Sequence, residues 1–436
     1  MTALGSYMRC AGCGERLAAD EPLPLQCPRT GELPDHDHVL RAELELEGTS
    51  FPDRSETNPF VRFRRLMHTY RLARRQGMSD DDYIALVRDL DDSVHQVDGR
   101  RFEETPYSLS DDLGVWFKNE TVQPSGSHKS RHLMGIAIHL EVIDRLGLAA
   151  TRETPLAIAS CGNAALAAAV IARAVGRKLR VFVPPSAAES VTRRLSELGA
   201  EQVVCERSPD LPLGDPCYHR YREAVAAGAL PFACQGNENG MTIAGGMTLG
   251  WELALQHRAQ AEEPLDRLFV QVGGGALASS VFQALDVAVR LGVLASMPTL
   301  HAVQTSNAHP LWVAWSAVAS KAEEVGVAAA LEHAASHRSE YMRPWPNEPE
   351  SLAYGILDDE TYDWLTIVRG LVTTGGSVPR VGEDRLRATW KQAREATGID
   401  VCATGIAGLA GALSLRDAGE LATEEQVAVL FTGTRR

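Results

Sequence analysis

Short apolar runs alternate with longer amphipathic ones through most of the chain after Phe102. Stretches such as SRHLMGIAIHLEVIDRLG and ALASSVFQALDVAVRLG have helical periodicity, and short runs rich in apolar residues separate them. Strands alternating with helices of this length predict βαβ units, in which a mainly parallel sheet is covered by helices on both faces. The fold class is therefore α/β. The runs predicted to be buried strands are LGVWFK, PLAIAS, LRVFVP, EQVVCE, RLFVQV, TLHAVQT and VAVLFTG.

The chain before Phe102 has a different pattern. Residues 1–48 hold three cysteines and two histidines in a stretch rich in Pro, Gly and Asp, and residues 58–90 show a charged, helical pattern. With 436 residues, of which 44% are hydrophobic, the chain is long enough for two or three domains.

The net charge of −14 disfavours binding to nucleic acid or to an anionic membrane surface. The N-terminus has no apolar segment typical of a signal peptide. Polar residues interrupt the apolar stretch 155–176, which predicts a strand and a helix rather than a membrane span. Eight cysteines are too few for a disulfide scaffold. We expect a cytoplasmic protein.

Four predicted turns at strand ends carry unusual residues, and ligands of such sheets bind at strand ends. The first turn, KNETVQPSGSHKSR, places Lys129 in the first turn of a helix. The helix dipole and partial burial both favour a neutral amine, which can form a Schiff base or take up a proton. A solvated lysine at a helix start is the alternative.

The other turns hold an amide, a glycine run and a hydroxyl. Ser160 to Asn163 (SCGN) separate a strand from a helix, where they can simply cap the helix or hold an amide over a ligand. The run VGGGALASS brings backbone N–H groups to a helix N-terminus, which suits a phosphate. Thr432 and Gly433 end the last predicted strand.

In this order and spacing, the four turns resemble fold-type-II pyridoxal-phosphate enzymes, a family that includes threonine synthase, cysteine synthase, cysteate synthase and the serine and threonine dehydratases. The resemblance covers about residues 102–436 and implies the tryptophan-synthase-β-like fold of two domains. The residues at matching places are Glu120, Pro124, Ser125, Gly126, Ser127, Lys129, Arg131, Ser160, Gly162, Asn163, Gly273, Gly274, Gly275, Ala276, Thr432 and Gly433.

The resemblance implies a role for each matching residue. Lys129 would hold pyridoxal 5′-phosphate as a Schiff base and move the α-proton of the substrate. Asn163 would bind the 3′-oxygen of the cofactor, and Thr432 would face its ring nitrogen. The residues expected to bind its phosphate are Gly273, Gly274, Gly275 and Ala276, and those expected near the substrate are Ser127, Ser160, Gly162 and Arg131.

A hydroxyl at the ring nitrogen makes the cofactor a weaker electron sink than an aspartate would. The resemblance therefore implies β- or γ-replacement, or elimination, on an amino acid with an activated O-linked leaving group. Other hypotheses are a dehydratase that stops at elimination, a nicotinamide dehydrogenase suggested by the glycine run, and a non-catalytic binding module. The dehydrogenase is weakened because the run is not GxGxxG.

The chain also departs from the family pattern. His128 replaces the usual aromatic residue before the lysine, where we expect a packing or surface role, and Ser130 replaces the usual acidic residue. Segment 323–379 has no familiar counterpart. We expect a large cofactor-binding domain of residues 49–122 and 226–436, a small domain of residues 123–225, and, by resemblance, a homodimer.

Residues 1–48 resemble the zinc-ribbon-like segment with which some threonine synthases begin. Cys10, Cys13 and Cys27 match three of its ligands, and Thr30 stands at the fourth position. A tetrahedral zinc site would need His36 or His38 as well. The alternative is a degenerate ribbon with free thiols.

Overall fold

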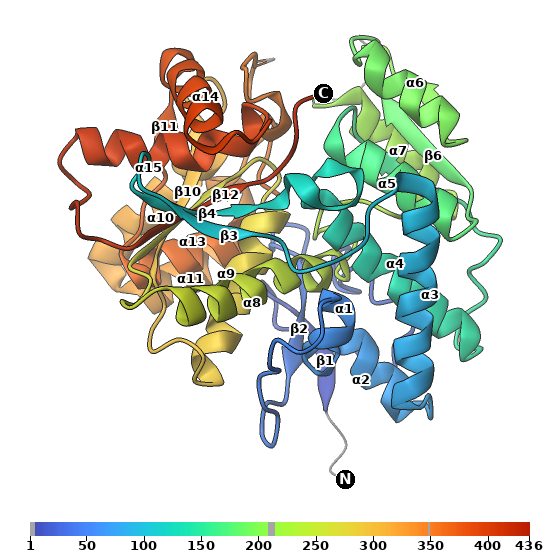
Figure 1. The fold of residues 1–436 in the computed structure, drawn as a ribbon. Helices are drawn as coiled ribbons and strands as arrows, with labels where there is room; N and C mark the ends of the chain where they lie inside the picture. The colour runs from blue at the N-terminus through green and yellow to red at the C-terminus, as the bar shows by residue number, and fades with distance from the viewer. Residues whose placement is uncertain (1–4, 208–213, 348) are drawn as a thin grey trace.

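The computed structural model describes residues 5–207, 214–347 and 349–436 and folds them into two α/β units with a small N-terminal ribbon (Figure 1). The strands are β1 (Ser6–Cys10), β2 (Leu40–Leu44), β3 (Tyr107–Ser110), β4 (Val115–Asn119), β5 (Leu156–Ala159), β6 (Leu179–Val183), β7 (Glu201–Val204), β8 (Leu230–Pro231), β9 (Arg267–Gln271), β10 (Thr299–Thr305), β11 (Arg380–Val381) and β12 (Val427–Phe431). The α-helices are α1 (Pro59–Arg62), α2 (His68–Arg75), α3 (Asp80–Asp98), α4 (Lys129–Arg145), α5 (Asn163–Ala174), α6 (Glu189–Glu197), α7 (Pro216–Ala226), α8 (Thr242–Gln260), α9 (Ala276–Arg290), α10 (Pro310–Val325), α11 (Val327–Ser336), α12 (Arg338–Tyr341), α13 (Trp364–Thr374), α14 (Glu383–Thr397) and α15 (Ala407–Asp417).

The large sheet has the order β11-β10-β9-β12-β4-β3, and every neighbouring pair is parallel except β3 and β4. Side chains of a strand alternate between its faces. In β12, Val427, Val429 and Phe431 join a core shared with α14 and α15, whereas Ala428 and Leu430 join the core that contains α8, α9 and α13. Both faces are therefore buried, as the continuous apolar runs predict.

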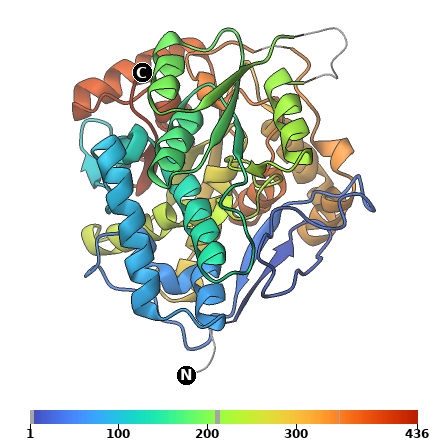
Figure 2. The same ribbon diagram turned by 90° about the vertical axis from the view of Figure 1, so that its right-hand side faces the viewer.

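The small sheet has the order β7-β6-β5-β8 and is wholly parallel. Helices α5, α6 and α7 pack against its strands, α4 packs on α5, and α3 lies against α4 and α5 (Figure 2). Strand β8 pairs with β5, so Leu230–Pro231 belong to the small sheet. The domain boundary expected at residue 225 is too early at this point, because a two-residue strand gives no periodic signal.

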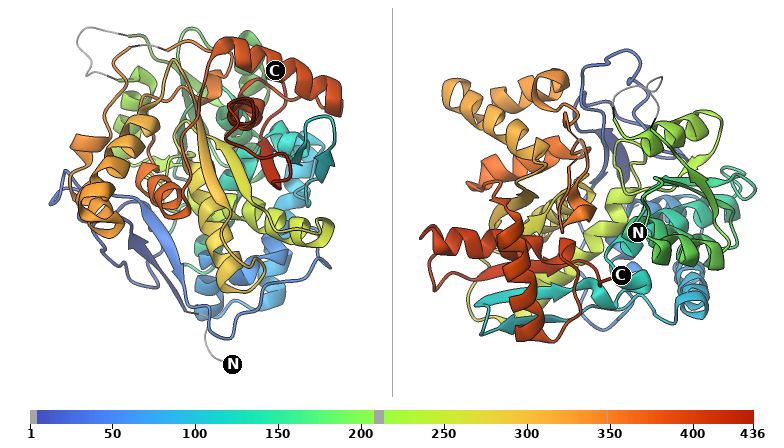
Figure 3. Two further views of the ribbon diagram at one scale, coloured as in Figure 1. Left: turned by 90° about the vertical axis from the view of Figure 1, so that its left-hand side faces the viewer. Right: turned by 90° about the horizontal axis from the view of Figure 1, so that it is seen from above.

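The N-terminal ribbon is the antiparallel pair β1 and β2, in which Ser6 lies opposite Leu44. It packs against α2 and lies at the lower edge of the molecule in Figure 2. Seen from above, the two α/β units stand side by side, and the C-terminus lies between them (Figure 3). The ends of β12 and of the Lys129 turn therefore meet where the two units face each other.

All seven predicted strands are present, as β4, β5, β6, β7, β9, β10 and β12, and the α/β fold class is confirmed. Within the described ranges, no helix has the length and apolar character needed to cross a membrane. The four predicted turns follow β4, β5, β9 and β12.

Candidate functional site

The turn that carries Lys129 lies along the end of β12. Ser127 forms a β-bridge with Gly433, and the backbone N–H of His128 donates to the carbonyl of Thr432 at 3.0 Å. Helix α4 then begins at Lys129, whose side chain is half-buried. The first and last of the four predicted turns are therefore in direct contact.

Thr432 is held by a residue of the neighbouring strand. The amide Nε2 of Gln271, the last residue of β9, donates to Thr432 Oγ1 at 2.7 Å. Because that oxygen accepts this bond, the Thr432 hydroxyl keeps its own hydrogen for another acceptor. Gln271 was missed by the sequence analysis, which treated it only as a strand residue.

The glycine loop joins β9 to α9. Gly275 has a φ of +99°, which favours glycine, and Ala276 is the first helical residue. The segment just before α13 binds the carbonyl groups of this loop. Thr361 Oγ1 donates to Gly273 O at 2.9 Å, and the Asp363 N–H donates to Gly274 O at 3.1 Å. Residues 361–363 thus fix the loop that the sequence predicts to bind phosphate.

A carboxylate lies against this loop. A Cβ built on Gly273 would be 2.2 Å from Asp358 Oδ2, and the backbone N–H of Gly274 donates to the Asp358 carboxylate. Burial raises the pKa of Asp358, while the positive charge of Lys129 and the Gly274 bond act in the opposite direction. Asp358 lies in the segment without a familiar counterpart, so no sequence motif points to it.

The Ser160–Asn163 turn reaches the same place from the small unit. A Cβ on Gly433 would be 2.7 Å from Asn163 Nδ2, so the end of the Asn163 side chain lies directly against Gly433. Asn163 Oδ1 accepts from Arg436 Nε at 3.0 Å, and Gly162 faces the ring of Tyr354. The Ser160 hydroxyl stays within the turn, where it accepts from the Gly162 N–H at 3.4 Å. All four predicted turns therefore converge.

Arg131, expected near the substrate, is placed differently. Its side chain is fully buried, and each of its three nitrogens donates to Glu120 or Glu252, with the closest contacts at 2.7 Å and 2.8 Å. Lys118 also donates to Glu252, at 2.7 Å. Arg131 has no nitrogen left to bind an anion, so its expected substrate role is wrong. Its partner Glu252 stands 121 residues away, beyond the reach of motif spacing.

His128 is a packing residue, as the sequence analysis expects. Its Nδ1 lies 3.1 Å from the Thr432 carbonyl, to which it can only donate, and its ring packs edge-on against His132. Burial, with the positive charge of Lys129, holds the pKa of His128 well below its usual value. The neighbouring Ser127 has a buried hydroxyl without a hydrogen-bond partner among the described residues.

Two cysteines lie at the site. Cys234 follows β8, is buried, and is close enough to Lys129 for the ammonium to oppose the burial that raises its pKa. No sequence motif points to this cysteine. Burial also raises the pKa of Cys161, which keeps that thiol protonated, in line with its not being taken as a nucleophile.

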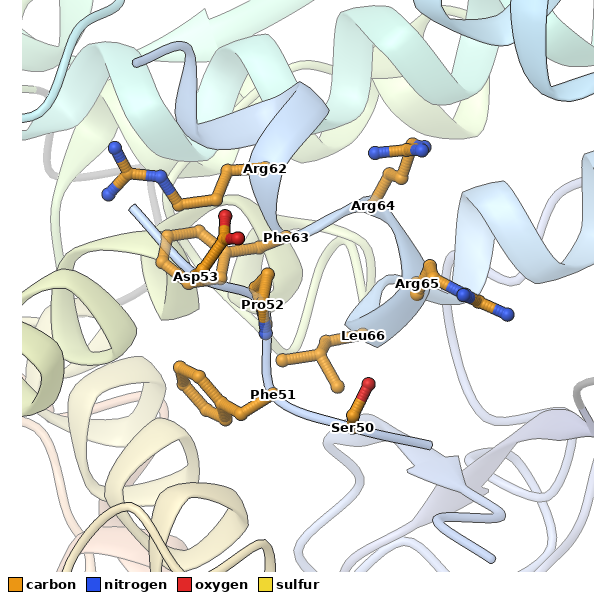
Figure 4. Close-up of a pocket in the computed structure, with 9 residues that line it drawn as sticks. All are labelled: Ser50, Phe51, Pro52, Asp53, Arg62, Phe63, Arg64, Arg65 and Leu66. Carbon is orange, nitrogen blue, oxygen red and sulfur yellow. The ribbon is translucent and has the colours of Figure 1, made fainter. Parts of the chain in front are cut away.

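Figure 4 shows a surface pocket of about 360 Å³ whose lining includes none of the predicted site residues. Two of its arginines are already paired, Arg62 with Glu104 and Arg64 with Asp80. It therefore offers an anion few free charges. The residues lining it are Ser50, Phe51, Pro52, Asp53, Arg62, Phe63, Arg64, Arg65 and Leu66.

These residues fit pyridoxal phosphate on three observations. Lys129 begins a helix between the loops, and Thr432 has a hydroxyl hydrogen to donate. The Ser127 hydroxyl, which has no partner in the part of the chain that the structure describes, belongs to the residue two positions before Lys129. Gly273 to Gly275 form a close-approach loop at a helix N-terminus, which suits a phosphate. The Asp358 carboxylate lies against that loop and would compete with a phosphate for it.

A family model described as "Pyridoxal-phosphate dependent enzyme" matches residues 101–433, and the chain belongs to this family. The fold is that of the fold-type-II enzymes, so the nicotinamide dehydrogenase hypothesis is wrong.

Among similar sequences, threonine synthase 2, chloroplastic, of Arabidopsis thaliana is 23% identical over 364 residues, covering 81% of this chain and 63% of that protein. The threonine synthase of Methanosarcina acetivorans is 23% identical over 333 residues, covering 74% of this chain and 72% of that protein. The chain thus spans less than two thirds of the Arabidopsis protein.

Among solved structures, threonine deaminase isoform 2 from Solanum lycopersicum superposes with a TM-score of 0.57 at 16% identity, covering 82% of this chain and 91% of that one. Maize serine racemase superposes with a TM-score of 0.58 at 20% identity, covering 79% of this chain and 93% of the racemase chain. At these identities the structures establish the fold only.

Proposed function

We propose that the protein is a threonine-synthase-like, pyridoxal-phosphate-dependent lyase or synthase. It acts on an amino acid that carries an activated O-linked leaving group and performs β- or γ-replacement. The similarity to two threonine synthases supports this class of reaction. The observation that carries the proposal is the Thr432 hydroxyl, held by Gln271 beside the turn of Lys129.

Bound pyridoxal phosphate would withdraw electrons from the α-carbon of an amino acid joined to it. Lys129 is the base placed to take the proton from that carbon. The electron pair left behind by that proton would expel the O-linked group from the β-carbon, and the leaving group would depart with the electrons of the C–O bond. Asn163, at the start of α5, would hold the ring over this amine.

Thr432 decides between reaction types. A neutral hydroxyl donates a hydrogen bond to the ring nitrogen without supplying a full proton, so the ring stabilises a carbanion only weakly. Prompt loss of a leaving group is then favoured over transamination. Gln271 holds the hydroxyl with its hydrogen free, which supports this role.

The substrate's anionic group needs a new partner, since Arg131 is occupied. Arg436 donates to Asn163 Oδ1 at 3.0 Å and also to the carbonyl of Ser125. Its guanidinium therefore links the two turns from which a substrate carboxylate or phosphate would be bound. Ser127, whose hydroxyl has no partner among residues 5–207, 214–347 and 349–436, completes this proposed anion site together with Ser160 and Gly162 of the adjacent turn. A cytoplasmic location and a homodimer stay predictions.

A panel of amino acids tests the reaction. The holoenzyme is mixed separately with O-phosphoserine, O-phosphohomoserine, O-acetylserine, serine and threonine, while the cofactor absorbance and the released phosphate, acetate or ammonia are followed. We expect spectral change and leaving-group release only with the activated substrates, and none with Lys129→Ala. Ammonia and keto acid from serine or threonine alone would establish a dehydratase instead. No response to any amino acid would favour a binding module.

A further inference from the structure

Four side chains with metal-binding atoms converge at the end of the N-terminal ribbon where the connecting loop joins its two strands. Cys10 ends β1, Cys13 and Cys27 follow in the connecting loop, and His38 precedes β2. One ligand atom from each of the four lies within 4.8 Å of the others. Cys10 comes from the end of β1 and the other three from the segment that leads to β2, so the connecting loop closes around one point.

The spacing of these atoms fits a tetrahedral ion. Cys13 Sγ and Cys27 Sγ are 3.6 Å apart, and Cys10 Sγ lies 3.5 Å from His38 Nδ1. A zinc ion with bonds of about 2.3 Å to sulfur and about 2.0–2.1 Å to nitrogen requires edges of roughly 3.8 Å and 3.6 Å. A disulfide requires about 2.0 Å between sulfurs, and these cysteines are free.

The orientation of His38 gives an independent indication. Its Nε2 lies 2.8 Å from the carbonyl oxygen of Leu33, which can only accept, so Nε2 carries the hydrogen. The lone pair of the neutral ring is then on Nδ1 and faces Cys10. Metal-binding histidines are commonly held in this way by a carbonyl on the opposite nitrogen. His36 stacks on His38 but contributes no atom to the cluster.

We propose that Cys10, Cys13, Cys27 and His38 bind one zinc ion, which holds the ribbon against the large unit. The residue next to His38 makes that contact. Asp37 is 2% exposed, accepts from Trp364 Nε1 at 2.9 Å, and donates through its N–H to the carbonyl of Ala335 at 2.9 Å.

The contact continues to the glycine loop. Trp364 begins α13, and the preceding Asp363 donates its N–H to Gly274 O and accepts from the Gly236 N–H at 3.1 Å. An ion that fixes His38 therefore also fixes the neighbouring Asp37, which holds Trp364 at the start of α13. The residue before Trp364, Asp363, is the one bonded to the glycine loop. The zinc ion has a structural role, since all four coordination positions are filled by protein.

Metal analysis of the full chain, purified without chelator, tests the site. We expect about one zinc ion per chain. His38→Ala should lower this to a small fraction, and the matched control His36→Ala should leave it unchanged. If His38→Ala does not fold, a second measurement takes the place of this variant: the unmodified chain is titrated with a mercurial thiol reagent, and zinc should be released as the thiols react. Unmodified protein with little zinc and three readily titrated thiols would overturn the proposal, as would zinc loss only in His36→Ala.

Hydrogen exchange tests the structural role. In zinc-free protein, the amides of residues 359–367 should exchange faster than in zinc-loaded protein, while those of β12 should not change. Equal exchange in both forms would show that the ion, even if bound, does not hold α13. This result is separate from the catalytic proposal, because no activity is measured.

Discussion

Replacing Asp358 by Asn should tighten the binding of pyridoxal phosphate. Without cofactor, the Asp358 carboxylate lies on Gly273 and accepts from the Gly274 N–H. A phosphate entering the loop has to displace it. A hydrogen bond to a charged group contributes about 1.5–3 kcal/mol, and one to a neutral amide oxygen about 0.5–1.5 kcal/mol. When phosphate binds, the variant therefore loses a hydrogen bond to the loop that is weaker by about 1–1.5 kcal/mol than the one lost by the wild type. This difference corresponds to a Kd for pyridoxal phosphate that is roughly five- to twelvefold lower.

The assay is fluorescence titration of cofactor-free enzyme with pyridoxal phosphate and, separately, with pyridoxal. Only the phosphorylated form should bind more tightly to Asp358→Asn. Asp359→Asn is the matched control, because it removes the same charge from the neighbouring residue. The pKa of Asp358 is raised, so its carboxyl becomes neutral sooner as the pH falls, and the difference between wild type and variant should narrow. An unchanged or weaker Kd for the phosphate form would refute the competition.

Three further predictions concern turnover, stability and substrate affinity. Thr432→Ala should keep the cofactor bound but lower kcat, and an unchanged kcat and spectrum would show that Thr432 does not face the ring. Burial would raise the pKa of Glu252, but its buried cations outweigh this and lower it to about 2. Its contribution to stability should therefore be complete at neutral pH and be lost between about pH 5 and 2. Glu252→Gln should lower the free energy of unfolding, measured in urea, by about 3–5 kcal/mol at pH 7. Replacing the exposed Lys391 by Gln should change the free energy of unfolding by less than about 1 kcal/mol. An equal loss of stability in both variants would show that the buried ion pairs of Glu252 contribute no more than a surface ion pair. Arg436→Gln should raise the KM of the reactive substrate more than kcat falls, while Arg435→Gln should leave both unchanged; a KM unaffected by Arg436→Gln would remove it from the anion site.

Much of the fold was predictable because its signals are local. Strands such as β9 and β12 are buried on both faces, so their runs are continuously apolar and easy to find. The strands that were missed are short or at an edge: β8 and β11 have two residues each. The ribbon strands β1 and β2 carry charged residues and depend on pairing across the connecting loop.

The residues of the candidate site could be predicted where a local motif surrounds a turn. They could not be predicted where contacts between distant segments decide which way a side chain points. Lys129 and the glycine loop were placed by their position between a strand and a helix. Arg131 was found by the same motif, but its partner Glu252 lies on α8, and only the fold brings them together. His36 and His38 are equivalent in sequence, and the Leu33 carbonyl distinguishes them only in three dimensions.

The central claim is that Lys129 binds the cofactor at the meeting point of the four turns. Borohydride reduction of the holoenzyme, followed by proteolysis and mass spectrometry, tests it most directly, because reduction makes the lysine linkage permanent. We expect a yellow protein that carries one pyridoxyl group on the peptide with Lys129, and no label in Lys129→Ala. A label on another lysine, such as the buried Lys118, or a protein that stays colourless after incubation with the cofactor, would contradict it.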